Sequence, residues 1–286
     1  MLHYYQAPKE WASAGILYTS LLSIPLTILL AYVYTTLMVT LPFVWLLPVI
    51  VFVVVLAWSW VIRFLTRWFK LYNKKSQLLV ALLSSLCLFY GQWAAFLMYL
   101  DVGHLPSLGY YGENLAVVLD ADFTGELLQS LYQFGFWEVG GAPLNGMMLV
   151  LFWILEALLL LLCPALFIWK VPLIPYSKER EKWYDKYILD RKFGTLLLEQ
   201  FPLDLQRDPM TTIEQAPLGK AGRYRLLELY HLPKSQKNYA AIKLVNLDHK
   251  GNIETSIAVA PFLVERVLVE RLIQHYKITK ERLELF

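Results

Sequence analysis

The chain has 286 residues, of which 57% are hydrophobic and only 17% are charged, and its formal net charge is +3 at pH 7. Soluble domains carry about 25% charged residues. This composition excludes a soluble globular enzyme, a disordered chain and a coiled coil, and it indicates an integral membrane protein.

Four apolar stretches are long enough to cross a bilayer. The chain from Trp11 to Ile62 contains no Asp, Glu, Lys, Arg or His. A single span needs about 20 apolar residues, so we expect two spans here, folded back at Thr40–Pro42, because proline continues a helix only at high cost. The four predicted transmembrane helices are Ala12–Val39, Phe43–Ile62, Gln77–Leu100 and Met147–Trp169.

The distribution of Lys and Arg predicts the orientation of these spans. The link between the second and third spans is basic and contains no acid, whereas the segment 101–146 contains acids but no Lys or Arg. Because Lys and Arg collect on the cytoplasmic side, we expect both termini and the basic link in the cytoplasm, the segment 101–146 outside it, and the chain in the cytoplasmic (inner) membrane. The basic link contains Arg63, Arg67, Lys70, Lys74 and Lys75.

The extracytoplasmic segment 101–146 is too long for a simple connector. Apolar residues at helical spacing predict an amphipathic helix within Phe123–Trp137, which either lies in the membrane interface or docks over the outer ends of the spans. An acidic cluster in this segment offers oxygen ligands for a divalent cation, but the charge asymmetry of the chain explains these acids without a metal. The members of the cluster are Asp101, His104, Asp120 and Asp122.

Glu156 is the only Asp, Glu, Lys or Arg in the sequence of the four predicted spans. An ionised carboxylate is costly there, so this group should be protonated, paired or directed into a wet cavity. Gln92 lies at a similar depth in the third span, counted from the outer ends at about 1.5 Å per residue. We therefore expect a structural Gln92–Glu156 hydrogen bond between helices. The alternative is that Glu156 couples the movement of protons or ions, although the spans hold no second acid and no Lys, Arg or His.

Residues 171–286 predict a small cytosolic α+β domain. Three runs rich in β-forming residues indicate an antiparallel three-stranded sheet, with a hairpin loop at Asp248–Asn252. The runs are Tyr224–Leu232, Tyr239–Leu247 and Ile253–Val259.

Helices are expected to cover this sheet. One should run from Tyr176 to about Leu198, and another should start at Pro261, since proline suits a first helical position. The stretch between the first helix and the sheet contains Pro202, Pro209, Pro217 and Gly219, and we expect a linker there.

Motifs of known chemistry are missing from the sequence. It contains no H-E-x-x-H, no G-x-S-x-G and no P-loop spacing. The domain 171–286 has a mild excess of Lys and Arg, which suits an anionic lipid surface but is too weak to indicate nucleic-acid binding. We expect no catalytic residues, no cofactor, no bound metal and no nucleic acid.

Two segments resemble uncharacterised bacterial four-span membrane proteins with a C-terminal cytosolic zinc-ribbon-like module. Residues 176–183 are similar to a Cys-x-x-Cys-x-x-Trp segment that follows the last span in that group, and the pattern from Gly135-Phe-Trp to Trp153-Ile-Leu-Glu-Ala is also similar. The resemblance implies the four-span topology. Ser177 and Arg180 occupy the positions of the cysteine ligands, so the thiolate zinc site that the resemblance implies is chemically absent.

Two hypotheses on function follow. In the first, residues 1–170 form a membrane domain that anchors a cytosolic domain, 171–286, and the whole is a scaffold or accessory subunit that binds other membrane or cytosolic proteins. In the second, the chain is a small transporter or channel component that uses Glu156. An enzyme ranks third, because no combination of acid, base and nucleophile is visible.

Overall fold

The structure is a computed structural model that describes residues 2–41, 46–139, 141–194, 199–219, 222–247 and 252–281. The chain divides into two compact units. The membrane domain is Glu10–Pro172, and the sheet domain combines Met1–Lys9 with Leu173–Phe286. Each unit is described by itself.

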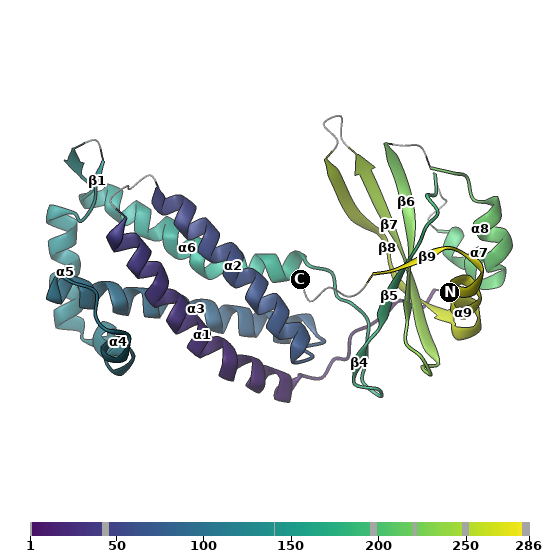
Figure 1. Cartoon of the computed structure of the whole chain (residues 1–286), viewed down its shortest axis with the longest axis horizontal. Helices are drawn as coiled ribbons and strands as arrows, with labels where there is room; N and C mark the ends of the chain where they lie inside the picture. The colour runs from purple at the N-terminus through teal and green to yellow at the C-terminus, as the bar shows by residue number, and fades with distance from the viewer. Residues whose placement is uncertain are drawn as a thin grey trace. The chain divides into compact units, whose positions relative to one another are not determined.

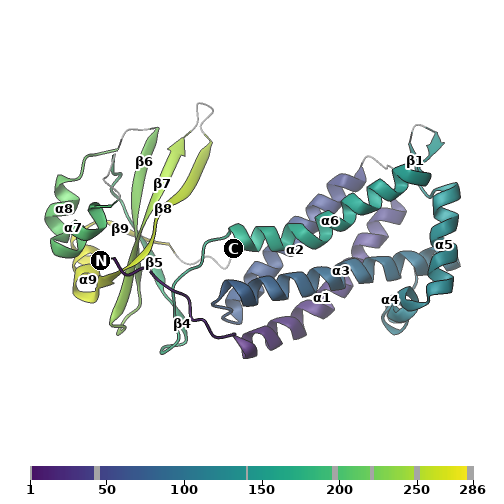
Figure 2. The same ribbon diagram turned by 180° about the vertical axis from the view of Figure 1, so that it is seen from behind.

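The membrane domain contains four long helices: α1 (Ser13–Thr40), α2 (Leu47–Trp68), α3 (Lys74–Val102) and α6 (Gly146–Lys170). All four are long and apolar enough to cross a membrane, which confirms the multi-pass prediction from the sequence. They lie side by side in both views (Figures 1 and 2). The reversal expected at Thr40–Pro42 begins where α1 ends, although Pro42 itself lies outside the described residues.

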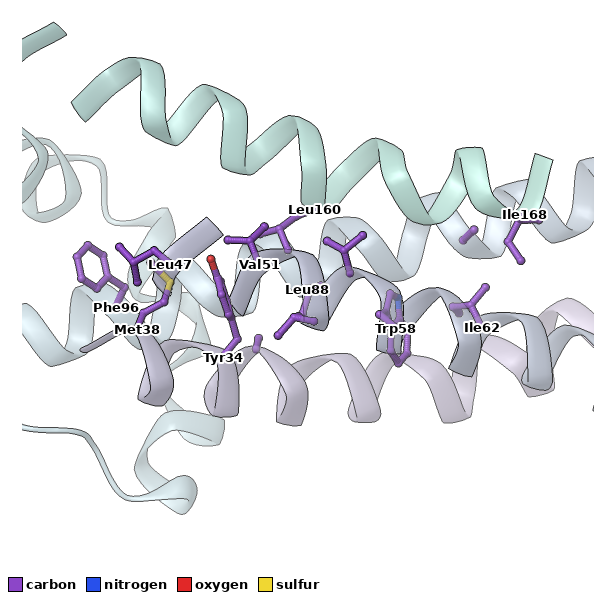
Figure 3. Packing of buried hydrophobic residues seen from close by; sticks show 14 of the residues in the cluster. Tyr34, Met38, Leu47, Val51, Trp58, Ile62, Leu88, Phe96, Leu160 and Ile168 are labelled. Carbon is purple, nitrogen blue, oxygen red and sulfur yellow. The ribbon is translucent and has the colours of Figure 1, made fainter. Parts of the chain in front are cut away.

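Helices α1 and α3 pack along a row of small residues. Every fourth residue of α1 from Gly15 to Thr35 is buried and is Gly, Ser, Thr or Ala. This spacing lets two helix backbones approach closely. On α3, Gly91 lies in the same contact, since a Cβ added there would stand 3.1 Å from the Cβ of Ala31. Larger side chains such as Tyr34, Met38 and Trp58 then fill the interior between the helices (Figure 3).

The basic link ties the ends of three helices together. Asn73 caps α3 by accepting a hydrogen bond from the Ser76 N–H at 2.7 Å, and its side-chain amide donates to the Glu10 carbonyl, just before α1, at 2.6 Å. The Lys74 ammonium donates to the carbonyl oxygens of Ile168, at 2.7 Å, and Val171 at the end of α6. A cation is favourable there because the last carbonyls of a helix lack intrahelical partners.

The sheet domain is built on a five-stranded antiparallel sheet with the order β8-β7-β6-β5-β9. Three helices within the described residues cover one face of this sheet (Figures 1 and 2), and the core between the helices and the sheet includes Phe193, Leu229 and Phe262. The strands are β5 (Asp185–Leu189), β6 (Arg223–His231), β7 (Lys237–Leu247), β8 (Ile253–Glu265) and β9 (Ile278–Glu281), and the helices are α7 (Phe201–Arg207), α8 (Pro209–Gln215) and α9 (Arg266–His275).

The prediction of a three-stranded sheet is wrong. The three predicted runs correspond to β6, β7 and β8, but β5 and β9 extend the sheet beyond β6. A helix from Tyr176 is also wrong, since a hairpin of β3 (Tyr176–Ser177) and β4 (Lys182–Trp183) precedes β5. The expected linker forms α7 and α8. The hairpin loop at Asp248–Asn252 falls largely on residues 248–251, which lie outside the described residues.

Strand β8 continues through Pro261, so the last helix starts at Arg266 instead of Pro261. Proline is tolerated in an edge strand because its missing N–H is not needed there for the ladder. Instead, the Pro261 carbonyl accepts a hydrogen bond from the Tyr5 N–H at 2.7 Å.

The amino-terminal residues add a short strand-like pairing to β8. Tyr4 forms an antiparallel bridge with Phe262, and the Leu263 N–H donates to the His3 carbonyl at 2.7 Å. The Tyr5 ring packs edge-on against Tyr239 at 5.1 Å between centroids. Burial raises the pKa of Tyr239 to about 12, so its hydroxyl stays neutral at physiological pH. The residues before α1 therefore belong to the same compact unit as the strands after α6.

Replacing Lys74 tests the cap on α6. Lys74→Gln should lower the stability of the folded protein by about 1–2 kcal/mol, because the charged donor at the helix end is lost. Lys75→Gln removes the same charge from the exposed neighbouring position and should change stability little. Thermal melting of both variants in the same detergent measures the difference, and equal losses would contradict the capping role.

Candidate functional site

The carboxyl group of Glu156 is buried in the centre of the membrane domain, with 3% of the residue exposed. It lies on α6 and accepts a hydrogen bond from the hydroxyl of Tyr34 on α1, which is fully buried. Figure 3 shows the Tyr34 side chain directed from α1 toward the helix that carries Leu160. The structure thus gives Glu156 a different partner from the expected Gln92.

Gln92 nevertheless lies at the same level of the bundle. Its backbone carbonyl accepts a hydrogen bond from the Thr35 hydroxyl at 3.2 Å, and Thr35 is the neighbour of Tyr34 on α1. The next residue of α3, Trp93, packs edge-on against Trp153 of α6 at 5.3 Å between centroids. The similarity of depth that suggested the pair is therefore present, while the side-chain oxygen of Gln92 is buried with no hydrogen-bond partner in the described chain.

Other buried polar atoms near the helix contacts also lack partners. Within the described residues of the membrane domain, these atoms include the Thr19 hydroxyl, the Ser85 hydroxyl and the indole N–H of Trp58. Most remaining hydroxyls bond to their own helix, as the Thr27 hydroxyl does to the Ser23 carbonyl at 2.9 Å. Buried polar groups are normally satisfied by protein or by ordered water, so the bundle interior has unused hydrogen-bonding capacity at several levels, one of which is that of Gln92.

Tyrosine side chains hold the segment after α3 against the bundle. Tyr32 of α1 donates to the Pro106 carbonyl at 2.7 Å, and Tyr90 of α3 donates to the Leu115 carbonyl at 2.8 Å. Tyr111, on the short helix α4 (Leu108–Glu113), is fully buried and lies 3.1 Å from the carbonyl oxygens of both Ile28 and Gly91. The segment is therefore packed against α1 and α3.

The predicted amphipathic helix is present as α5 (Ala121–Phe134). It follows the 3-10 helix η2 (Leu115–Leu119), and Leu128 and Leu131 belong to the core of the membrane domain. After α5, Phe136 and Trp137 pack on Phe96 at 5.3 and 5.7 Å between centroids. Helix α5 therefore packs against the spans through Leu128 and Leu131.

The acidic cluster is dispersed over separate elements. Asp101 is in the last turn of α3, Asp120 caps α5 by accepting from the Phe123 N–H at 3.1 Å, and Asp122 is in the first turn of α5. His104 contacts the Val102 carbonyl at 3.1 Å. Over the described part of the chain, no group of three or more His, Cys, Asp or Glu residues is arranged to hold a metal ion. Asp101 instead lines a pocket of about 220 Å³ with Glu113 and Phe123.

The sheet domain also contains a buried charged group that the sequence did not single out. Glu228 is 4% exposed, and its carboxylate lies 2.9 Å from the Lys186 ammonium and accepts a hydrogen bond from the Tyr230 hydroxyl at 2.9 Å. Alternation along β6 and pairing with β5 bring these groups together on one face of the sheet. The carboxylate is thus neutralised by its neighbours, which is a structural arrangement.

Ser177 and Arg180, at the positions of the cysteine ligands, lie in the β3–β4 hairpin. The Ser177 hydroxyl accepts a hydrogen bond from the Arg180 N–H at 3.4 Å. No family model, curated protein or solved structure matches the chain. The likeness to bacterial four-span proteins consequently stays an expectation from the sequence.

The Tyr34–Glu156 bond can be measured by a double-mutant cycle. Tyr34→Phe and Glu156→Leu should each destabilise the protein, and the coupling between them should be about 0.6–2 kcal/mol, the range for interhelical hydrogen bonds in membranes. Tyr18→Phe is the matched control, because Tyr18 is on the same helix and is 56% exposed. Melting of the single and double variants gives the coupling, and strictly additive losses would show that the two groups do not interact.

Proposed function

We propose that the chain is an integral membrane scaffold or accessory subunit that presents its sheet domain in the cytosol as a protein-interaction module, and that it is not itself catalytic. The observation that carries this proposal is the burial of Glu156 against Tyr34. A carboxyl group with a neutral hydrogen-bond donor in the helix contact serves to join α6 to α1. The membrane domain is then an anchor, and its partners are the bilayer and other membrane or cytosolic proteins.

The packing of the segment after α3 supports the anchoring role. Tyr32, Tyr90 and Tyr111 fasten this segment to α1 and α3 through backbone carbonyls. Two pockets lie away from the Tyr34–Glu156 contact, one beside α4 and η2 and one of about 460 Å³ between α7 and α8. Neither pocket is lined by Glu156.

The alternative function, a small transporter or channel component that uses Glu156, is favoured by a different observation. The side-chain oxygen of Gln92 and the hydroxyls of Thr19 and Ser85 are buried without partners among the described residues. Water molecules would satisfy such groups, and hydration that reached the Tyr34–Glu156 contact would give protons access to Glu156. The two functions differ in whether the carboxyl group must titrate.

Glu156→Gln separates the two functions. Gln keeps the shape and accepts the Tyr34 hydrogen bond but cannot titrate, so a scaffold should retain its melting temperature and its ability to complement a deletion strain. Glu156→Leu leaves the Tyr34 hydroxyl unpaired and should reduce stability by about 0.6–2 kcal/mol. A Gln variant of normal stability that fails to complement would overturn the scaffold proposal in favour of proton coupling.

The orientation is tested with single cysteines in a background without Cys87 and Cys163. Gly112→Cys, in the segment after α3, should react with a membrane-impermeant thiol reagent in intact cells. Gln236→Cys, in the exposed turn between β6 and β7, should react only after lysis. This expectation follows from the basic link and the absence of Lys and Arg from 101–146. Labelling of Gln236→Cys in intact cells would contradict the predicted orientation.

A further inference from the structure

Strand β8 is an edge strand whose two halves differ. It is the terminal strand of the five-stranded order. Near its carboxyl end, the amino-terminal residues pair with Phe262 and Leu263. Within the described residues, the bridge from Tyr4 is the one pairing on the outer side of β8, so the half from Ile253 to Ile257 is an open edge.

The open half exposes apolar side chains in a regular stretch of sheet. Residues 253–257 are all exposed, with Ile253 at 66% and Ile257 at 43%. They pair with residues 247–243 of β7 without a register shift, so alternation places Ile253, Thr255 and Ile257 on one face of the sheet. This end of β8 lies clear of α7, α8 and α9 (Figures 1 and 2).

An unpaired edge presents a row of N–H and C=O groups that can accept another strand. The same strand already accepts one, because the amino-terminal residues bind to it antiparallel at Phe262. An added strand next to 253–257 would continue this pairing along β8, and it would end where the amino-terminal residues begin.

The side chains of the open half are complementary to a second copy of themselves. The segment Ile253-Glu254-Thr255-Ser256-Ile257 is close to symmetric about its centre. It has isoleucine at both ends, threonine in the middle and a polar residue at each position between. In an antiparallel pair centred on Thr255, each Ile253 faces Ile257 of the other copy, and each Glu254 faces Ser256. Thr255 faces its own counterpart, and such Thr–Thr and apolar cross-strand pairs are favourable, each by about 0.2–1 kcal/mol. No acid stands directly opposite another acid in this register.

We infer that two copies of this chain associate through residues 253–257 of β8, which pair antiparallel across a two-fold axis at Thr255 and join the two five-stranded sheets. The contact is isologous, so it closes on itself as a dimer. The surface area that two paired five-residue strands bury is smaller than the roughly 1,000 Å² that a stable interface buries. Confinement of both copies to one bilayer raises their effective concentration and compensates for this small area.

The register is tested by cysteine crosslinking of the full chain in native membranes, again without Cys87 and Cys163. Directly opposite residues of antiparallel strands have Cα atoms about 4.5–5.5 Å apart, which is within the range of a disulfide. Thr255→Cys should therefore form a covalent dimer by itself on oxidation. Ile253→Cys and Ile257→Cys should each stay monomeric alone and crosslink when two differently tagged copies are co-expressed.

Val267→Cys is the control for random collision, since Val267 is 55% exposed on α9 of the same domain. Dimer yield from Thr255→Cys no greater than from Val267→Cys would overturn the inference. Crosslinking of Ile253→Cys with itself as strongly as with Ile257→Cys would overturn the register, and with it the self-complementarity on which the inference depends.

A charge exchange at the two-fold axis tests association without a covalent bond. Thr255→Lys and Thr255→Glu each place like charges opposite one another, so each variant alone should lose the dimer on size determination in mild detergent. Two co-expressed, differently tagged variants should pair with each other, and a tag on the Lys variant should recover about tenfold more Glu variant than Lys variant. Melting temperatures equal to wild type confirm that both variants fold. Equal recovery of the two would refute pairing at Thr255, whatever partners the scaffold has.

Discussion

The close contact between α1 and α3 is the constraint on which the membrane domain depends. The row of small residues at every fourth position of α1 allows the two backbones to approach. The neighbouring residues Tyr34 and Thr35 then reach α6 and α3 at one level, through Glu156 and the Gln92 carbonyl. Earlier on α1, the Tyr32 hydroxyl and the Ile28 carbonyl form hydrogen bonds with the segment after α3. Each of these contacts requires α1 to lie where the small residues place it.

Tyrosine supplies much of the polar connection in this domain. A hydroxyl on an aromatic ring brings a hydrogen-bond donor into an apolar region at a far lower desolvation cost than a charged group. Tyr32, Tyr90 and Tyr111 each donate to a backbone carbonyl, and Tyr34 donates to Glu156. This use of tyrosine lets a chain with few charges satisfy polar groups that lipid cannot satisfy.

The sequence predicted the elements that depend on local pattern and missed those that depend on distant partners. Long apolar runs located all four spans, since no long-range contact is needed to make a run apolar. Strand β5 was expected to be helical because Trp183, Tyr184 and Tyr187 also suit one face of a helix. Its strand geometry comes from pairing with β6 and β9, residues distant in the chain. Likewise, the sequence identified Glu156 as a buried acid but did not identify Tyr34 as its hydrogen-bond partner. Charged and amide side chains are the partners expected of a buried acid, and tyrosine is neither.

The two halves of β8 show why an open edge in this domain is significant. Edge strands are commonly protected by proline, by irregular pairing or by a covering segment. The half near Phe262 has all three: Pro261, the register shifts between Ala240 and Lys243 of β7, and the amino-terminal residues. The half from Ile253 to Ile257 is regular, and Glu254 is its single charge. Because one strand is protected at one end and open with β-branched apolar residues at the other, the open end has the properties of a contact surface.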